Sequence, residues 1–286
     1  MVRIGVIGDF SHRQSVASHI AGLPDRIGAT GFVTDLSQLE PVAADIDGLD
    51  ALVWVHRSGD RHGGATAALR SATDAGVPTI AWCPVRSDGP ESFPDAFTGA
   101  DVVAVVTSHH DDAWTATVDG DLRLTAPATA DTDTGAGSFR DNLPTGAVIV
   151  GAEANPDLTE QIRDALPGVV VWPAARWLGG RFAAHVAATA HTLIVIDDHG
   201  PGRWSPHVPA LLGAGGRIIA AADPSLEAAF DCDIGTYTDV ADIVELVEVA
   251  EAHPDTAADR QRRVDAVIDG GHTHLARFVD LLAAVT

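Results

Sequence analysis

The chain has 286 residues, of which 40 are Asp or Glu and 18 are Lys or Arg, so its formal net charge at neutral pH is −22. All 18 basic residues are arginine, and the hydrophobic share of 46% is that of a globular protein. This composition excludes an extended nucleic-acid surface and a basic membrane-binding surface, because both need clustered Lys and Arg, and no apolar run reaches the roughly 18 residues of a membrane span.

In the first half, short β-branched runs alternate with longer amphipathic stretches, which is typical of strand–helix units around a mainly parallel sheet. A helix is expected from Ser11 or His12 to Leu23, and another over 63–75. An Asp-Gly dipeptide between 115–118 and 121–124 indicates a hairpin. The expected strands are 3–7, 30–34, 51–55, 79–82 and 102–107.

The second half repeats this alternation after a segment rich in Thr, Asp, Gly, Ala and Pro. We expect two α/β domains, residues 1–125 and 147–286, joined by a linker over 126–146, with C-terminal helices in the second domain. The expected strands are 147–150, 169–172, 193–196, 217–221 and 234–237. The expected helices are 156–166, 180–188, 206–212, 224–230, 240–250, 256–269 and 273–285.

The common catalytic fingerprints are absent from the sequence. No Gly-x-Gly-x-x-Gly follows the first strand, and a P-loop is impossible without lysine. No Gly-x-Ser-x-Gly, His-Glu-x-x-His or Cys-x-x-Cys occurs either. The two cysteines, Cys83 and Cys232, have no metal-ligand or disulfide-framework spacing, which favours buried thiols in a cytoplasmic protein. We expect no metal site.

The first candidate site follows the first strand, because ligands of open α/β sheets bind outside the carboxyl ends of the strands. Asp9 and His12 stand there. A histidine oriented by a carboxylate can act as a general base, so these two residues are the catalytic candidates. The alternative is that Asp9 or Ser11 caps a helix.

Polar residues also follow the strands of the second half, among them Glu153 and Arg176. The most informative loop leads into the helix that starts near Pro206. Its glycines allow close backbone approach, its arginine can bind an anion, and the start of a helix favours negative charge. The alternative is an ordinary tight loop with a helix cap. The candidate residues of this loop are His199, Gly200, Gly202, Arg203 and Ser205.

Several segments between residues 147 and 286 resemble the GT-B glycosyltransferases. Residues 205–220 are similar to the helix, small-residue turn and strand near the donor site of those enzymes. Residues 223–230 and 237–243 resemble the two segments that follow. The end of the chain, His272-Thr273-His274 with Arg277 three residues later, is similar to the tail of the spore-maturation (CgeB-like) glycosyltransferases.

This resemblance implies two Rossmann-like domains with mainly parallel sheets facing across a cleft, the donor on the second and the acceptor on the first. It implies a hexosyl or pentosyl transfer from a UDP-, GDP- or dTDP-sugar to an acceptor that the sequence does not identify, with no tightly bound cofactor or metal. Glu227 matches the acidic residue that contacts donor hydroxyls, and Asp9 or His12 lies where the acceptor-activating base stands. Arg203 would replace the lysine that often faces the diphosphate.

Two other functions stay open. Val208 and Pro209 stand where the first acidic residue of the donor-site helix would fall, which motivates a non-catalytic interaction module with the same fold. A sugar-nucleotide epimerase shares the two-domain architecture. A homodimer is compatible with each of these functions.

Overall fold

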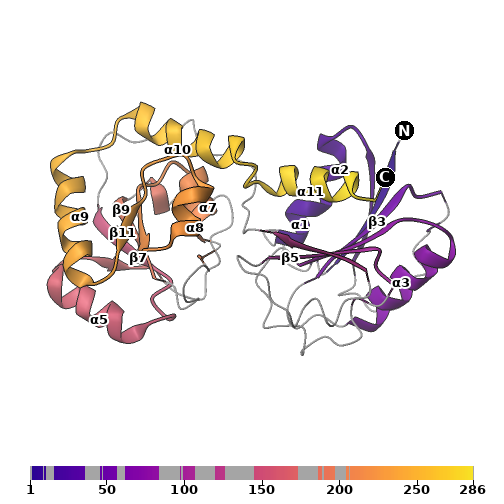
Figure 1. Cartoon of the computed structure of the whole chain (residues 1–286), viewed down its shortest axis with the longest axis horizontal. Helices are drawn as coiled ribbons and strands as arrows, with labels where there is room; N and C mark the ends of the chain where they lie inside the picture. The colour runs from indigo at the N-terminus through magenta and orange to yellow at the C-terminus, as the bar shows by residue number, and fades with distance from the viewer. Residues whose placement is uncertain are drawn as a thin grey trace. The chain divides into compact units, whose positions relative to one another are not determined.

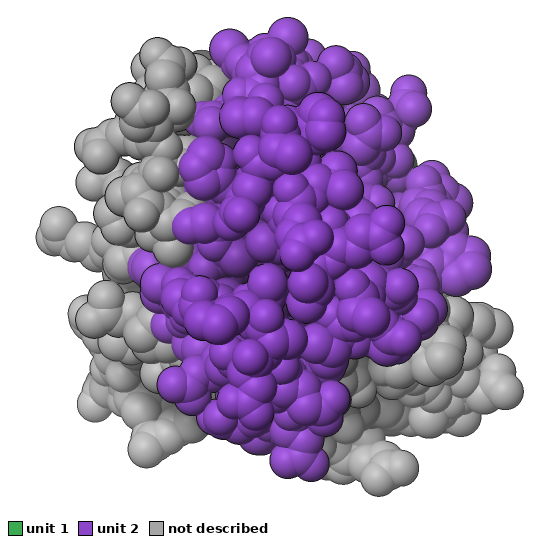
Figure 2. All heavy atoms as spheres, turned by 90° about the vertical axis from the view of Figure 1, so that its left-hand side faces the viewer, with its two compact units in different colours: residues 1–127, 274–286 green, residues 128–273 purple. Residues whose placement is uncertain are grey.

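The computed structural model divides the chain into two compact units, residues 1–127 with 274–286, and residues 128–273 (Figure 1). The second unit is purple in Figure 2. The structure describes residues 2–8, 10, 16–35, 46, 48–56, 62–83, 97, 99–106, 120–125, 145–172, 186–188, 190–196, 204–205 and 207–285.

The first unit is built on a parallel sheet with the strand order β2-β1-β3-β4-β5-β6. Every residue of its two central strands, β3 and β4, is buried, as expected when both faces of a sheet are covered. All five strands expected in this half are confirmed. The strands are β1 (Arg3–Gly8), β2 (Thr30–Asp35), β3 (Ala51–Val55), β4 (Thr79–Cys83), β5 (Val102–Val106) and β6 (Asp121–Thr125).

Alternate residues of these strands enter two separate cores, because successive side chains point to opposite faces of a sheet. Leu52 and Trp54 pack with the helix α3 (His62–Asp74) on one face. Val53 and Val55 pack on the other face with α1 (Val16–Ala21) and α2 (Leu23–Arg26).

The single helix expected from Ser11 or His12 to Leu23 is wrong in its described part. The chain turns at Gly22, and a second short helix begins with Leu23. Pro24 explains the break, since it lacks the N–H that would continue the helical hydrogen bonds across the turn. The expected hairpin stays a prediction: β6 pairs in parallel with β5, and residues 115–118 lie outside the described residues.

The last helix, α11 (His274–Ala283), belongs to the first unit, whereas the sequence assigned residues 147–286 to one domain. Its apolar face completes the core above β3 and β4, where Phe278 and Leu281 lie with Ile20 of α1. The physical reason is burial: this face needs an apolar partner, and position along the chain does not decide which sheet supplies it.

The second unit is built on a five-stranded parallel sheet in the order β11-β10-β9-β7-β8. All five expected strands are present, and β7 begins two residues earlier than predicted, within the expected linker. The strands are β7 (Thr145–Val150), β8 (Val170–Val171), β9 (Ala190–Val195), β10 (Ile218–Ala221) and β11 (Gly235–Tyr237).

Helices cover both faces of this sheet (Figure 1). On one face, Ile149, Ile194 and Ile219 pack with α5 (Pro156–Ala165) and α9 (Val240–Ala252). The helices α7 (His207–Gly213) and α10 (Ala257–Asp269) pack together, with α7 against β10. The short helix α8 (Pro224–Ala229) follows β10.

Several helices of the second unit begin after residues whose side chains cap the first turn. Asn155 caps α5, and reciprocal capping boxes start α9 at Asp239 and α10 at Thr256. Within the described residues, no helix is both long and apolar enough to cross a membrane.

Candidate functional site

The candidate site of the second unit is the carboxyl edge of its sheet. The chain leaves β7 for β8 on one side and reaches β9 on the other, so the switch point of the topology lies between β7 and β9. Gly151 follows β7 with φ +79°, and a Cβ atom there would clash with the carbonyl oxygen of Ile196, which follows β9. Only glycine permits this close approach of the two strand ends.

Asp223 follows the neighbouring strand, β10, and is 6% exposed. Its Oδ1 accepts a hydrogen bond from the backbone N–H of Ser225 at 2.8 Å and so caps α8. Its Oδ2 and the hydroxyl of Ser225 are buried and have no hydrogen-bond partner in the structure. The Oδ2 atom can therefore still accept a hydrogen bond and the Ser225 hydroxyl can still donate one, both at the carboxyl edge of the sheet.

Ser205 stands at the start of α7 and is buried. Its hydroxyl accepts a hydrogen bond from the N–H of His207 at 3.1 Å, and its carbonyl accepts one from Val208 at 3.0 Å. The neighbouring Trp204 packs edge-on against Phe230, with ring centroids 5.3 Å apart. Ser205 is therefore held firmly by its own helix and by this aromatic contact.

The first sheet has the same kind of edge, since its switch point lies between β1 and β3. A Cβ on Gly8 would crowd Phe10 and the carbonyl of Val55. His56 follows β3, is fully buried, and donates its backbone N–H to the carbonyl of Trp82 at 2.8 Å. Its ring packs edge-on against Trp54 at 4.9 Å.

The structure describes three of the ten predicted site residues. Glu153, Ser205 and Glu227 follow the carboxyl ends of the adjacent strands β7, β9 and β10, so the topology brings them to one edge. Glu153 and Glu227 are exposed, and no hydrogen bond or ion pair joins the three in the structure. The other predicted site residues lie outside the described residues: Asp9, His12, Arg176, His199, Gly200, Gly202 and Arg203.

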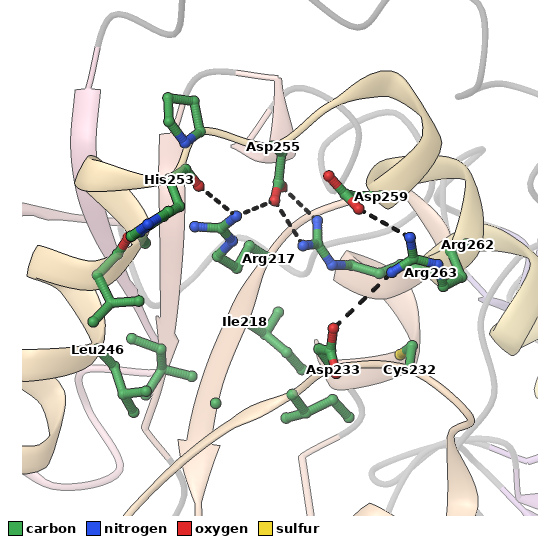
Figure 3. Close-up of a pocket in the computed structure, with 16 residues that line it drawn as sticks. Arg217, Ile218, Cys232, Asp233, Leu246, His253, Asp255, Asp259, Arg262 and Arg263 are labelled. Atoms are coloured by element: carbon green, nitrogen blue, oxygen red, sulfur yellow. Dashed lines mark hydrogen bonds and ion pairs between the residues drawn. The ribbon is translucent and has the colours of Figure 1, made fainter.

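A charged cluster that the sequence did not predict lies at the opposite, amino edge of the second sheet (Figure 3). Arg263 binds Asp255 through two parallel hydrogen bonds of 2.5 and 2.8 Å, and Arg217 binds the same carboxylate. Burial acts to raise the pKa of Asp255, but the hydrogen bonds and charges of the two arginines outweigh it and lower that pKa below the ordinary 3.8. No local motif indicates this cluster, because its members meet only in the folded unit.

The described residues contain no group of three or more His, Cys, Asp or Glu side chains arranged to hold a metal ion. At the edge of the charged cluster, burial raises the pKa of Cys232 to about 11, which keeps its thiol protonated at neutral pH.

Solved structures match the fold over nearly the whole chain. Sucrose-phosphate synthase from Thermosynechococcus elongatus matches with a TM-score of 0.60 at 9% identity, covering 99% of this chain and 98% of the other. HepE from Anabaena, in complex with UDP and glucose, matches with 0.58 at 10% identity and 99% of each chain. AviGT4, a glycosyltransferase involved in avilamycin A biosynthesis, matches with 0.56 at 12% identity over 100% of this chain and 98% of its own.

The sequence matches no protein-family model and no curated protein. The structural matches confirm the predicted fold: the chain has the two Rossmann-like units of the GT-B glycosyltransferases. At these identities the likeness concerns the fold, and the finer resemblance to the CgeB-like enzymes stays a prediction.

Proposed function

We propose that the second unit binds a nucleotide sugar at the carboxyl edge of its sheet, and that the protein transfers the sugar to an acceptor. The observation that carries this proposal is the switch point itself. Gly151 lets the ends of β7 and β9 approach each other closely at this point, and Asp223 and Ser225, after the neighbouring strand β10, leave buried polar atoms without a hydrogen-bond partner among the described residues. A fold shared with HepE, which was solved with UDP and glucose, supports a nucleotide there.

The proposed contacts divide between phosphate and hydroxyl groups. Arg203 would bind the diphosphate, with Gly200 and Gly202 allowing close approach, and Ser205 would hold the start of α7 beside it. Glu227, exposed on α8, would accept hydrogen bonds from donor hydroxyls. The remaining proposed donor contacts are Glu153, Arg176 and His199.

The proposed reaction needs no metal. The acceptor hydroxyl oxygen forms a bond to the anomeric carbon while the bond from that carbon to the phosphate oxygen breaks. Negative charge grows on the leaving diphosphate, so a fixed arginine stabilises the transition state more than the ground state. The acceptor proton passes to His12, which Asp9 orients.

The first test is thermal unfolding with a panel of UDP, GDP, dTDP and their sugars. A selective ligand at about 100 times its Kd stabilises the protein by about 2.7 kcal/mol. Arg203→Ala is expected to abolish that shift. The matched control is Arg163→Ala, since Arg163 is an exposed arginine of the same unit that pairs only with Glu160 on its own helix. If Arg203→Ala binds as well as wild type, the proposed site is wrong.

A separate observation supports a second candidate function, that of a non-catalytic protein. The helix α7 has the sequence His-Val-Pro-Ala-Leu-Leu-Gly, so no acidic side chain extends from it, and Val208 and Pro209 are buried. This favours a non-catalytic protein that keeps the fold. If that is its function, every nucleotide in the panel leaves the unfolding temperature unchanged, or a nucleotide sugar binds and is neither hydrolysed nor transferred.

A further inference from the structure

A pocket of about 450 Å³ opens at the amino ends of β10 and β11, between the end of α9 and the start of α10 (Figure 3). Arg217 immediately precedes β10, and residues 232–234 precede β11. The proposed nucleotide site lies at the carboxyl edge of the same sheet, so this pocket is a different place in the unit. Its volume falls within the range of small-molecule sites.

Arg217 presents hydrogen-bond donors to this pocket. Its Nη2 donates to Asp255 and, at 2.9 Å, to the carbonyl of His253, which fixes the guanidinium in one orientation. Its Nε and Nη1 make no hydrogen bond in the structure, and the side chain keeps 22% of its surface exposed. A guanidinium held from one side with donors left on the other is ready to bind an anion.

The two neighbouring arginines are less suited to bind that anion. Both terminal nitrogens of Arg263 donate hydrogen bonds to Asp255, and Nη1 also donates to the carbonyl of Gly215 at 3.2 Å. Arg262 pairs with Asp259 at 3.0 Å. The pocket thus holds three arginines against Asp233, Asp255 and Asp259. Among these three, Arg217 is the arginine that is both largely covered and left with unused donors, whereas Arg262 keeps 57% of its side chain in solvent.

An apolar wall stands beside Arg217. Leu246, Val249 and Ala250 of α9 line it together with Ile218 of β10. Val249 is 51% exposed, which leaves apolar area for a ligand to cover. In Figure 3, Ile218 and Leu246 lie below Arg217, with Leu246 on the side of α9.

We propose that this pocket is a second ligand site, which binds a small amphipathic monocarboxylate with its charge on Arg217 and its apolar body against Leu246 and Val249. A monoanion suits one guanidinium with unused donors, and the three aspartates repel a dianionic phosphate more strongly than they repel a monocarboxylate. Cys232 also lines the pocket, and burial raises its pKa to about 11, so it adds no negative charge to the site at neutral pH.

The test uses the full chain and backbone amide NMR titration with three probes: hexanoate, hexanol and inorganic phosphate. Hexanoate is expected to give saturable shifts confined to residues 217–219, 232–235 and 246–263. Hexanol, which lacks the charge, and phosphate, which lacks the apolar body, are expected to give none that saturate at the same concentrations.

Val249→Glu tests the site without touching the ion-pair cluster. It places a carboxylate beside Arg217 from an exposed helix position, so hexanoate is expected to bind about tenfold more weakly. Ile268→Glu makes the same change at an exposed position of α10 outside the pocket, and is expected to bind as wild type does. Hexanoate that shifts no amides of the pocket, equal affinity in Val249→Glu, or saturable phosphate binding at these residues would each overturn the proposal.

Discussion

At the scale of single residues, Asp255 is a carboxylate of the second unit that binds two arginines at once. It joins Arg217 at the entrance of β10 to Arg263 on α10, and it is 7% exposed. It therefore ties the start of a central strand to a helix on the face of the sheet. Removing one charge from a buried cluster leaves its partners without compensation, which costs more than the cluster contributes intact.

We expect Asp255→Asn to lower the free energy of unfolding by about 3 kcal/mol at neutral pH, because it leaves two arginines facing a neutral amide. The measurement is urea unfolding of both proteins. Asp233→Asn is the matched control, since Asp233 is 99% exposed and its pair with Arg262 is 4.0 Å long. Its effect is expected to stay within about 0.5 kcal/mol.

The stability that Asp255 contributes is also expected to depend on pH. The folded-state pKa of Asp255 is lowered, so its contribution to stability is fully present above the unfolded value of about 3.8 and is lost as the pH falls toward the folded value. The stability of wild type should therefore converge on that of Asp255→Asn in acid. A gap between the two that stays constant from neutral pH to about pH 3 would contradict the role given to this carboxylate.

At the scale of elements, α11 shows how burial decides which unit a helix joins. Phe278 is 1% exposed and packs on Trp82 of β4, with ring centroids 6.5 Å apart. His274, at the start of the helix, is buried against the same tryptophan at 6.0 Å. This end of the chain therefore acts as a covering layer of the first sheet.

Phe278→Ala is expected to destabilise the protein by about 3–5 kcal/mol, because it removes a buried aromatic ring and leaves a cavity. Amide hydrogen exchange should show lost protection in β3 and β4, with β7 and β9 protected as before. Val279→Ala is the control, since Val279 is the next residue and is 44% exposed. Equal loss of protection in both sheets would mean that α11 does not belong to the first unit alone.

Sequence reasoning predicted the strands well because most are short runs rich in apolar and β-branched residues. It placed two helices over 240–250 and 256–269, and the structure begins them after the caps Asp239 and Thr256. It failed at Gly22, because it continued one helix to Leu23 although the chain turns there and a second short helix begins with Leu23. It also assigned α11 by position along the chain, although only tertiary burial decides that point.

The position of the candidate site could be predicted from the sequence, but some of the residues that form it could not. Topology alone puts Glu153, Ser205 and Glu227 at one edge of the second sheet. The buried Oδ2 of Asp223 emerges only from the packing around it. Likewise, Arg217 and Asp255 are far apart in sequence, so no spacing rule points to their contact.

At the scale of the whole molecule, charge is the dominant feature. The chain has 40 acidic residues and 18 arginines, so the carboxylates outnumber the arginines by 22. Among the described ion pairs, those of Arg163, Arg262 and Arg123 join exposed side chains and contribute little. Self-repulsion of this excess negative charge therefore opposes compaction of the chain.

We expect the Tm at neutral pH to rise when NaCl increases from about 0.02 M to about 1 M, because the screening length falls from roughly 20 Å to roughly 3 Å. Sucrose is the control, since an uncharged solute stabilises by exclusion without screening charge and should give the same shift at low and high salt. A Tm that falls with salt would mean that attractive surface pairs outweigh the repulsion. The buried bonds of Asp255 are screened far less, so Asp255→Asn should keep its deficit at both salt concentrations, which separates the local cluster from the general field.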